Sequence, residues 1–449
     1  MDIRNWILVD TLMILINLLY VLNKLRFLKG RSSFFARSSI FFLLLLFIFP
    51  SGLVPVGVLS LVELTDIPRN WYFHLKIGPL GIADIVTMFF SVICFFDLSR
   101  SGRINRFILM TLLFILVIFF AGNLSAMIFA VSVDYQNLLN VARTFLVIIL
   151  FFYAGYAVIK RFGEDAINVL SSCLWATFII SLVSMTVLNP SSRAIRYFVP
   201  AMLQSQQFVS VIPFLALYFY AKRHENMVCK KHWLLWAAAM FMMFFMGYKA
   251  FYFLLILFAA TYVVSKLRIT SKTTGAILFM VALLISQPIL LYLNFIFGGF
   301  SAVDTRTFQV INSMKTLQDR GLMSMLFGIG WGQWYTVYFE FPTIDYGAWG
   351  ANQLASDDAK YSIQIAPFSL IRSIGVLGFA AVLGAAMVYI RRLANTRISK
   401  GDDKFLLCGM VAINVSAFFT LPDVLQETAA FAAFFCAAMV AMKGKHEVA

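Results

Sequence analysis

Long apolar runs, separated by short polar or basic segments, dominate the chain from end to end. A helix needs about 20 mostly apolar residues to cross a bilayer. Runs of this kind predict membrane-spanning helices near residues 6–22, 38–60, 77–96, 107–127, 138–158, 168–188, 206–221, 232–246, 250–265, 274–297, 366–390, 405–421 and 426–442. The pattern predicts an all-α fold, a polytopic transmembrane helical bundle of about 13 spans, or roughly 11–14 because the pair near 232–265 is short. No internal repeat is visible, so residues 1–449 are expected to form a single integral membrane domain.

One long polar segment, residues 298–365, separates the tenth and eleventh predicted spans. It contains an amphipathic stretch (TFQVINSMKTLQ), a glycine-rich turn (LFGIGWGQW) and a part rich in Trp and Tyr (WYTVYFEFPTIDYGAW). Tyr and Trp favour the boundary between water and lipid. We therefore expect this loop to be partly helical and folded on the membrane surface.

Composition excludes a soluble protein, because 61% of the residues are hydrophobic and only 13% are charged, with a mean hydropathy of +0.86. A soluble domain carries roughly 25% charged residues. The net charge of +15 resides in short clusters between apolar runs, and no basic patch with interleaved aromatic residues suggests a nucleic-acid partner. The five cysteines and four histidines are scattered, so neither a metal site nor a cofactor is expected.

The distribution of basic residues predicts the orientation of the chain. Assigning alternate loops to one side of the membrane collects 24 of the 36 Lys and Arg residues there. Cytoplasmic loops carry this excess of positive charge. The N-terminus is therefore expected outside, the C-terminus in the cytoplasm, and residues 298–365 outside.

Basic residues on the outer face are candidates for chemistry, because orientation does not require them. The cations that we single out there are Arg193, Arg196, Lys249, Arg306, Lys360 and Arg372, and Arg143 lies about one turn inside the fifth span. Charged groups within a span usually face a cavity or a partner. Guanidinium groups donate parallel hydrogen bonds that suit phosphate oxygens. Several of these groups together would bind a pyrophosphate at the outer leaflet.

Each of these residues also has a structural alternative. Arg193 and Arg196 can extend to lipid headgroups. Arg143 can form an ion pair with an acidic residue such as Asp84 in the third span.

Other polar residues of the long loop have ordinary interpretations. Lys315 and Arg320 are expected on the solvated face of a surface helix. The glycines of 328–332 resemble a phosphate-binding loop but lack its strand and helix, so a tight turn is the better interpretation, with a substrate-binding role for Gly330 as the alternative. The pair Asp357–Asp358 is expected to be an exposed acidic turn, with a divalent-cation site as the alternative.

Arg306, the later segment LFGIGWGQW and the span entry SLIRSIGVLGF resemble the long periplasmic loop of the Wzy-type O-antigen polymerase and O-antigen ligase group. The topology is similar over the whole chain, and the motifs are similar over about 245–255 and 300–380. The resemblance implies a GT-C-like membrane glycosyltransferase of the bacterial inner membrane. It implies undecaprenyl-pyrophosphate-linked glycans as substrates. In an inner membrane, the orientation that the basic residues predict gives a periplasmic N-terminus and a cytoplasmic C-terminus.

The resemblance also implies roles for particular residues. Arg306 matches the arginine that opens the long loop of the group, and either Arg193 or Arg196 matches an arginine of an earlier outer loop. In the group these arginines face the lipid-linked pyrophosphate. Lys249 stands where many members have arginine in a Ser-Arg pair. Asp304 is our candidate for a general base, with Asp357 and Asp358 as alternatives.

One position favours the polymerases over the ligases. Ligases carry a His-Asn pair, then nine residues, then Gly-x-x-Gly. Counting back from Gly375 and Gly378 places Gln364-Ile365 at the position of that pair, so the histidine is absent. The expected function is metal-independent polymerisation of lipid-linked oligosaccharide repeat units, with a chain-length regulator and a flippase as partners. The alternatives are an O-antigen ligase that acts on lipid A-core, a flippase or transporter, and a peptidoglycan polymerase of the shape-and-division family.

Overall fold

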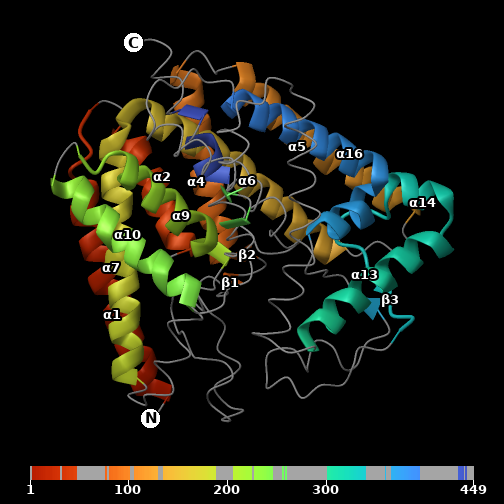
Figure 1. The fold of residues 1–449 in the computed structure, drawn as a ribbon, viewed down its shortest axis with the longest axis horizontal. Helices are drawn as coiled ribbons and strands as arrows, with labels where there is room; N and C mark the ends of the chain where they lie inside the picture. Colours follow the sequence, from red (N-terminus) through yellow and green to blue (C-terminus); the bar gives the residue numbers. More distant parts are fainter. Residues whose placement is uncertain are drawn as a thin grey trace.

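The structure is a computed structural model in which the described residues are mostly helical (Figure 1). It describes residues 3–30, 33–47, 76–77, 80–101, 106–129, 135–188, 206–224, 227–245, 255–256, 258–259, 301–339, 359–360, 366–394, 433–438 and 440–441.

In the described part of the chain, the apolar runs form helices where the sequence predicts them. The helices that coincide with predicted spans are α1 (Ile3–Leu25), α2 (Ser33–Phe47), α4 (Ile82–Ser101), α5 (Arg106–Phe129), α6 (Tyr135–Phe162), α7 (Glu164–Leu188), α9 (Gln206–Ala221), α10 (Met227–Phe245) and α16 (Ala366–Ala394). Within the described residues, three stretches are long and apolar enough to cross a membrane: Ile108–Phe129, Val141–Phe162 and Pro367–Ala385. The all-α prediction is confirmed for these residues, and the full count of spans remains a prediction. The predicted spans near 274–297 and 405–421 lie outside the described residues.

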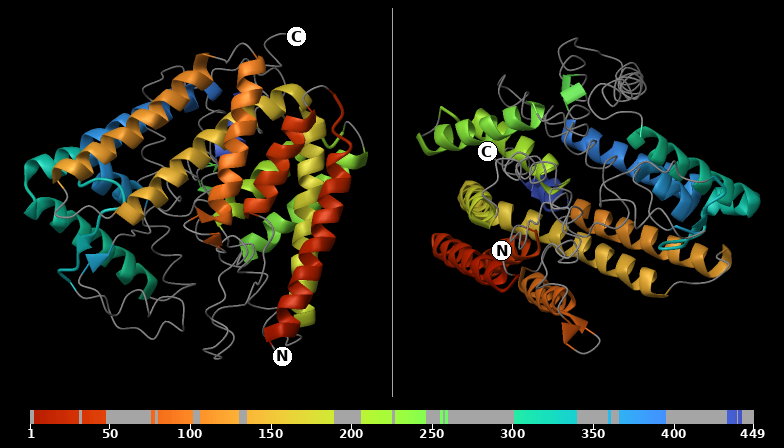
Figure 2. Two further views of the ribbon diagram at one scale, coloured as in Figure 1. Left: turned by 180° about the vertical axis from the view of Figure 1, so that it is seen from behind. Right: turned by 90° about the horizontal axis from the view of Figure 1, so that it is seen from below.

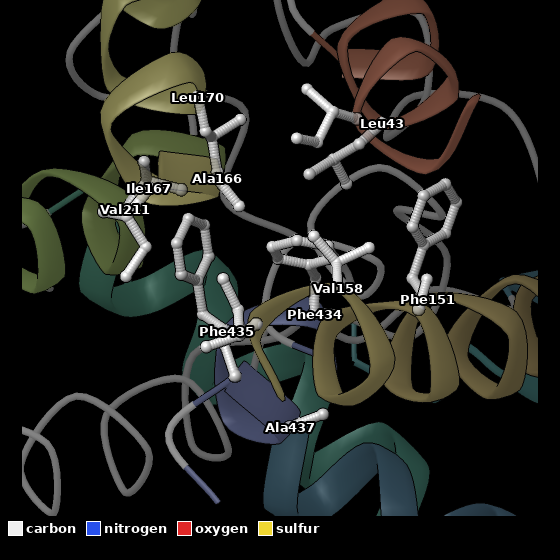
Figure 3. Close-up of a cluster of buried hydrophobic side chains, with 14 of the residues drawn as sticks. Leu43, Phe151, Val158, Ala166, Ile167, Leu170, Val211, Phe434, Phe435 and Ala437 are labelled. Atoms are coloured by element: carbon white, nitrogen blue, oxygen red, sulfur yellow. The ribbon is translucent and has the colours of Figure 1, made fainter. Parts of the chain in front are cut away.

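Helix α6 lies at the centre of the hydrophobic core (Figure 3). On one side Phe151 packs against Phe90 of α4, with ring centroids 4.8 Å apart. On another side, a Cβ atom at Gly155 would collide with the backbone carbonyl of Phe434, so only glycine allows the helical segment 433–438 to approach this closely. The ring of Phe435 in that segment packs against the ring of Phe214 of α9, with centroids 4.6 Å apart. The helical segment 433–438 is therefore part of the central core.

Two ion pairs show that α4 and α6 run parallel. At one end Asp84 pairs with Arg143, and at the other end Asp97 accepts hydrogen bonds from Arg161 at 2.5 Å and from the Tyr153 hydroxyl at 2.7 Å. The first residues of both helices therefore lie at one end, and the last residues at the other. This is the arrangement that α5 requires if it crosses back between them.

We expect Asp97→Ala to lower the stability of the bundle by about 3 kcal/mol, because it leaves the partly buried Arg161 without its partner. The measurement is the thermal unfolding temperature of the purified protein in detergent. Asp165→Ala, which removes an exposed carboxylate at the start of α7, is the control and should lose less than about 1 kcal/mol. Equal losses in both variants would show that the cluster at Asp97 contributes nothing specific.

The predicted outer loop contains regular structure of its own (Figure 2). Helix α13 (Ser301–Asp319) and the short helix α14 (Leu322–Phe327) are followed by strand β3 (Tyr335–Thr336), which pairs antiparallel with β4 (Ala359–Lys360). A second small antiparallel pair, β1 (Lys76–Ile77) and β2 (Leu80–Gly81), precedes α4. The prediction of a partly helical loop is confirmed for its described residues.

Candidate functional site

Helix α13 buries a polar face, where an amphipathic surface helix would bury an apolar one. Gln309, Asn312, Ser313 and Thr316 are all buried, at spacings of three and four that place them on one side of the helix. Asn312 accepts the backbone N–H groups of Tyr338 and Phe339 at 2.9 and 2.8 Å through its Oδ1 atom. Thr316 Oγ1 accepts the backbone N–H of Thr336 at 3.0 Å. This polar face therefore holds the chain that follows the glycine turn.

The glycine turn docks on the backbone of α16. The N–H of Ile329 donates to the carbonyl of Arg372 at 2.8 Å, and the N–H of Gly330 donates to that of Ser373 at 3.0 Å. These carbonyls are available because α16 is kinked at Gly375, whose φ of 70° is not helical. The tight turn is confirmed, with positive φ at Gly328, Gly330 and Gly332. The backbone N–H of Gly330 is thus hydrogen-bonded within the protein, and its role in binding substrate remains a prediction.

Trp331 fixes this turn between α5 and α6. Its Nε1 donates to the carbonyl of Ile118 at 3.3 Å, and its ring meets Phe145 edge-on at 5.1 Å. Any side chain at Gly122 would overlap the indole ring. The turn is therefore held by contacts with three apolar helices, α5, α6 and α16.

Arg372 is the largest fully buried side chain among the described residues, with 1% exposure. Its guanidinium carbon lies 5.8 Å from the ring centroid of Tyr335. Burial raises the pKa of Tyr335 to about 12, although the charge of Arg372 acts in the opposite direction. The phenol therefore stays protonated at neutral pH. Because Tyr335 pairs with Lys360 in the β-ladder, the structure brings Arg372, Lys360 and Gly330 into one region.

Several neutral polar side chains near this region were not identified from the sequence. They are Ser313 of α13, Gln333 after the turn, and Ser369 and Ser373 of α16, all buried. Within the described part of the chain, the oxygen atoms of these four side chains have no hydrogen-bond partner. Buried polar atoms of this kind are usually satisfied by water or by a ligand. A signal was available, because two serines four residues apart flank an arginine in an apolar helix.

Arg143 forms the structural pair that the sequence left open. Its Nη1 lies 3.0 Å from Oδ1 of Asp84, and the other carboxylate oxygen accepts the N–H of Gly81 at 3.0 Å. The exposed fraction of the side chain is 30% for Arg143 and 31% for Asp84. Arg143 stands two residues before Phe145, which contacts Trp331. The pair is thus close along α6 to the docked turn, and a role in binding substrate stays a prediction.

Arg306 and Asp304 both lie in the first two turns of α13. The structure describes the helical backbone at both positions but not their side chains. The roles of Arg306 and Asp304 therefore remain predictions.

The remaining candidates fall in other parts of the chain. Arg193, Arg196, Lys249, Asp357 and Asp358 lie outside the described residues. Among the residues that the structure describes, no group of three His, Cys, Asp or Glu side chains is arranged to hold a metal ion.

The prediction that Arg320 lies on a solvated face is wrong. Its Nη1 donates to the carbonyl of Phe129, the last residue of α5, at 3.3 Å, and burial lowers the pKa of its guanidinium. Carbonyl groups at a helix C-terminus lack intrahelical partners, so a cation there is stabilising. Lys315 places its ammonium group 4.7 Å from the ring centroid of Tyr338. Arg320 is thus bound to the end of α5, and Lys315 contacts a ring within the loop.

The chain matches no protein-family model, no curated protein and no solved structure. What the fold itself defines is a mostly helical chain with helices apolar enough to span a membrane.

Proposed function

We propose that this protein is a glycosyltransferase that polymerises undecaprenyl-pyrophosphate-linked oligosaccharide repeat units at the periplasmic face of the bacterial inner membrane, producing O-antigen or a related polysaccharide. The observation that carries the proposal is the docked outer loop. The end of its short helix α14 and its glycine turn are seated on the kink of the apolar helix α16, next to the buried Arg372. A transporter or flippase would not need such an assembly, whereas a site for lipid-linked phosphate at the outer leaflet would.

The reaction transfers the growing glycan from its lipid carrier to a new repeat unit. A hydroxyl oxygen of the incoming unit attacks the anomeric carbon of the growing chain, and the bond from that carbon to the pyrophosphate oxygen breaks. The hydroxyl proton goes to a general base, and the lipid pyrophosphate leaves with the electron pair. Negative charge grows on the leaving group, so prearranged cations stabilise the transition state more than the substrate.

In this proposal the arginines bind the leaving pyrophosphate. Arg306, in the second turn of α13, acts with Arg193 or Arg196 from the earlier outer loop. Arg372 and Lys360 add positive charge beside the turn. Arg372 is buried, and charges interact more strongly where water is excluded. Asp304 is the candidate for the base, with Asp357 and Asp358 as alternatives.

The proposed reaction needs no divalent metal. We expect the purified protein to polymerise lipid-linked repeat units in excess EDTA, without lipid A-core as an acceptor. Product ladders on gels are the measurement. Loss of activity in chelator that magnesium or manganese restores would contradict the metal-free mechanism and would indicate Asp357 and Asp358 as ligands. A strict need for lipid A-core would favour a ligase.

The proposed site also requires a defined orientation. We expect a reporter enzyme fused after Gly347 to be active in the periplasm and one fused after Lys400 to be active in the cytoplasm, because the charged loops follow the positive-inside rule. Paired fusions to alkaline phosphatase and to a fluorescent protein measure this at matched expression. If both fusions report the same side, the number of spans between them is not odd as predicted. The proposed periplasmic site would then be contradicted.

A further inference from the structure

The short helix α14 exposes an unusually apolar surface. Four of its six residues are large apolar side chains in contact with solvent, among them Leu322 at 70% and Met323 at 55% exposure, and only Ser324 is buried. The helix contains no charged residue. An exposed apolar surface on a loop generally marks contact with a partner or a membrane.

Helix α14 lies beside one end of α5 (Figures 1 and 2). The Ser125 hydroxyl of α5 donates to the carbonyl of Phe327 at 2.8 Å, which joins the end of α14 to the last turns of α5. The neighbouring α5 side chains Leu124, Met127 and Ile128 are also exposed, Met127 at 78%. Helix α5 has the highest hydropathy of the candidate spans and buries little of its surface. A surface that continues the lipid-facing side of a spanning helix fits the same environment.

The charged groups near α14 are arranged as they would be at a lipid boundary. Arg320 donates a hydrogen bond to the carbonyl of Phe129. Gln318 and Asp319, at the end of α13, are exposed. A polar-to-apolar change therefore occurs between Asp319 and Leu322. Charges that remain beside hydrocarbon are expected to bind a backbone carbonyl or extend to water.

We infer that α14 is inserted into the hydrocarbon of the outer leaflet, with acyl chains of the bilayer covering its apolar side chains. The outer loop is then anchored in the membrane and is not only adsorbed to its surface. Because α14 connects α13 to the turn that docks on α16, this anchor sets the depth of both relative to the lipid headgroups. The inference does not depend on the proposed chemistry, because it concerns only where α14 lies.

Depth-dependent fluorescence quenching tests this inference. In a variant without native cysteines, reconstituted in phosphatidylglycerol and phosphatidylethanolamine vesicles, single cysteines at Leu322 and Met323 carry an environment-sensitive fluorophore. Met127→Cys is the lipid-facing control and Gln318→Cys is the water-facing control on the same loop. Lipids spin-labelled near the start of the acyl chain should quench Leu322→Cys and Met323→Cys roughly threefold more than Gln318→Cys, as expected for about 5–10 Å of insertion. Aqueous iodide should show the reverse order.

Two results would overturn the inference. Quenching of Leu322→Cys and Met323→Cys by iodide to the extent seen at Gln318→Cys would place α14 in water. Quenching by neither agent would mean that protein, either another segment or a second copy, covers α14. The readout does not involve polymer synthesis, so its failure and a failure of the proposed function are separate results.

Discussion

Arg306→Ala is expected to abolish long-chain polymer while the protein remains folded in the membrane. The proposed role of this arginine is a charge-assisted contact with the departing pyrophosphate. Removing one such donor lowers the rate by on the order of 10²–10³, or 3–4 kcal/mol. Polymer ladders on gels, compared at matched protein levels in the membrane fraction, are the measurement.

A conservative change and a matched control separate chemistry from general charge. Arg306→Lys should recover only part of the activity, because an ammonium group cannot donate the two parallel hydrogen bonds that a guanidinium group donates to phosphate oxygens. Arg320 is unsuitable as the control, because it binds the end of α5. Lys315→Ala removes the same charge from the same helix at a residue that contacts only the rings of Tyr338 and Phe339 among its described partners. Equal, mild effects of Arg306→Ala and Lys315→Ala would refute the specific role of Arg306.

Gly375→Ala is expected to detach the docked loop from α16. The residue has a φ of 70°, which an L side chain rarely adopts, and its Cβ atom would collide with the backbone carbonyl of Leu326. The strained backbone costs about 1–3 kcal/mol, and crowding against a backbone atom adds about 1–3 kcal/mol. We expect a lower unfolding temperature in detergent, faster proteolysis of the outer loop and loss of polymer.

The same helix offers a control for this substitution. Gly384 lies nine residues further along α16, and a Cβ atom there would meet no heavy atom within 4 Å. Gly384→Ala should leave the loop intact and slightly stabilise α16, because alanine favours helix by about 1 kcal/mol relative to glycine. If both substitutions are equally harmless, the kink at Gly375 is not what holds the loop in place.

Local patterns in the sequence predicted the helices and several details of the loop. Apolar runs form helices because a chain with so few polar groups satisfies its backbone most readily by internal hydrogen bonds. For Arg143, inside a span, the sequence left two alternatives: binding of substrate, or an ion pair with Asp84. The structure contains the ion pair. The glycine turn was predicted because glycine readily adopts positive φ, as Gly328, Gly330 and Gly332 do in the structure. In each case a residue's neighbours in sequence contained the necessary information.

The arrangement of the candidate site could not be predicted in this way. The hydrogen bond from Ser125 to Phe327 joins residues 202 positions apart, and that from Trp331 to Ile118 joins residues 213 positions apart. Arg320 resembles any solvated surface cation until α5 ends beside it, and the polar face of α13 resembles a solvated face until the chain after the turn binds it.

The sequence by itself determined which segments are helical, which residues are charged and where the backbone can turn, because these depend on side chains within a few positions. Only the tertiary structure decided that the buried side of α13 is polar, that Arg372 is buried beside Tyr335, and that the turn docks on a kink in α16. Burial and hydrogen bonding depend on which distant segments meet. A periodic pattern indicates that a face exists, but the partner that covers the face determines whether its polar groups meet water, protein or ligand.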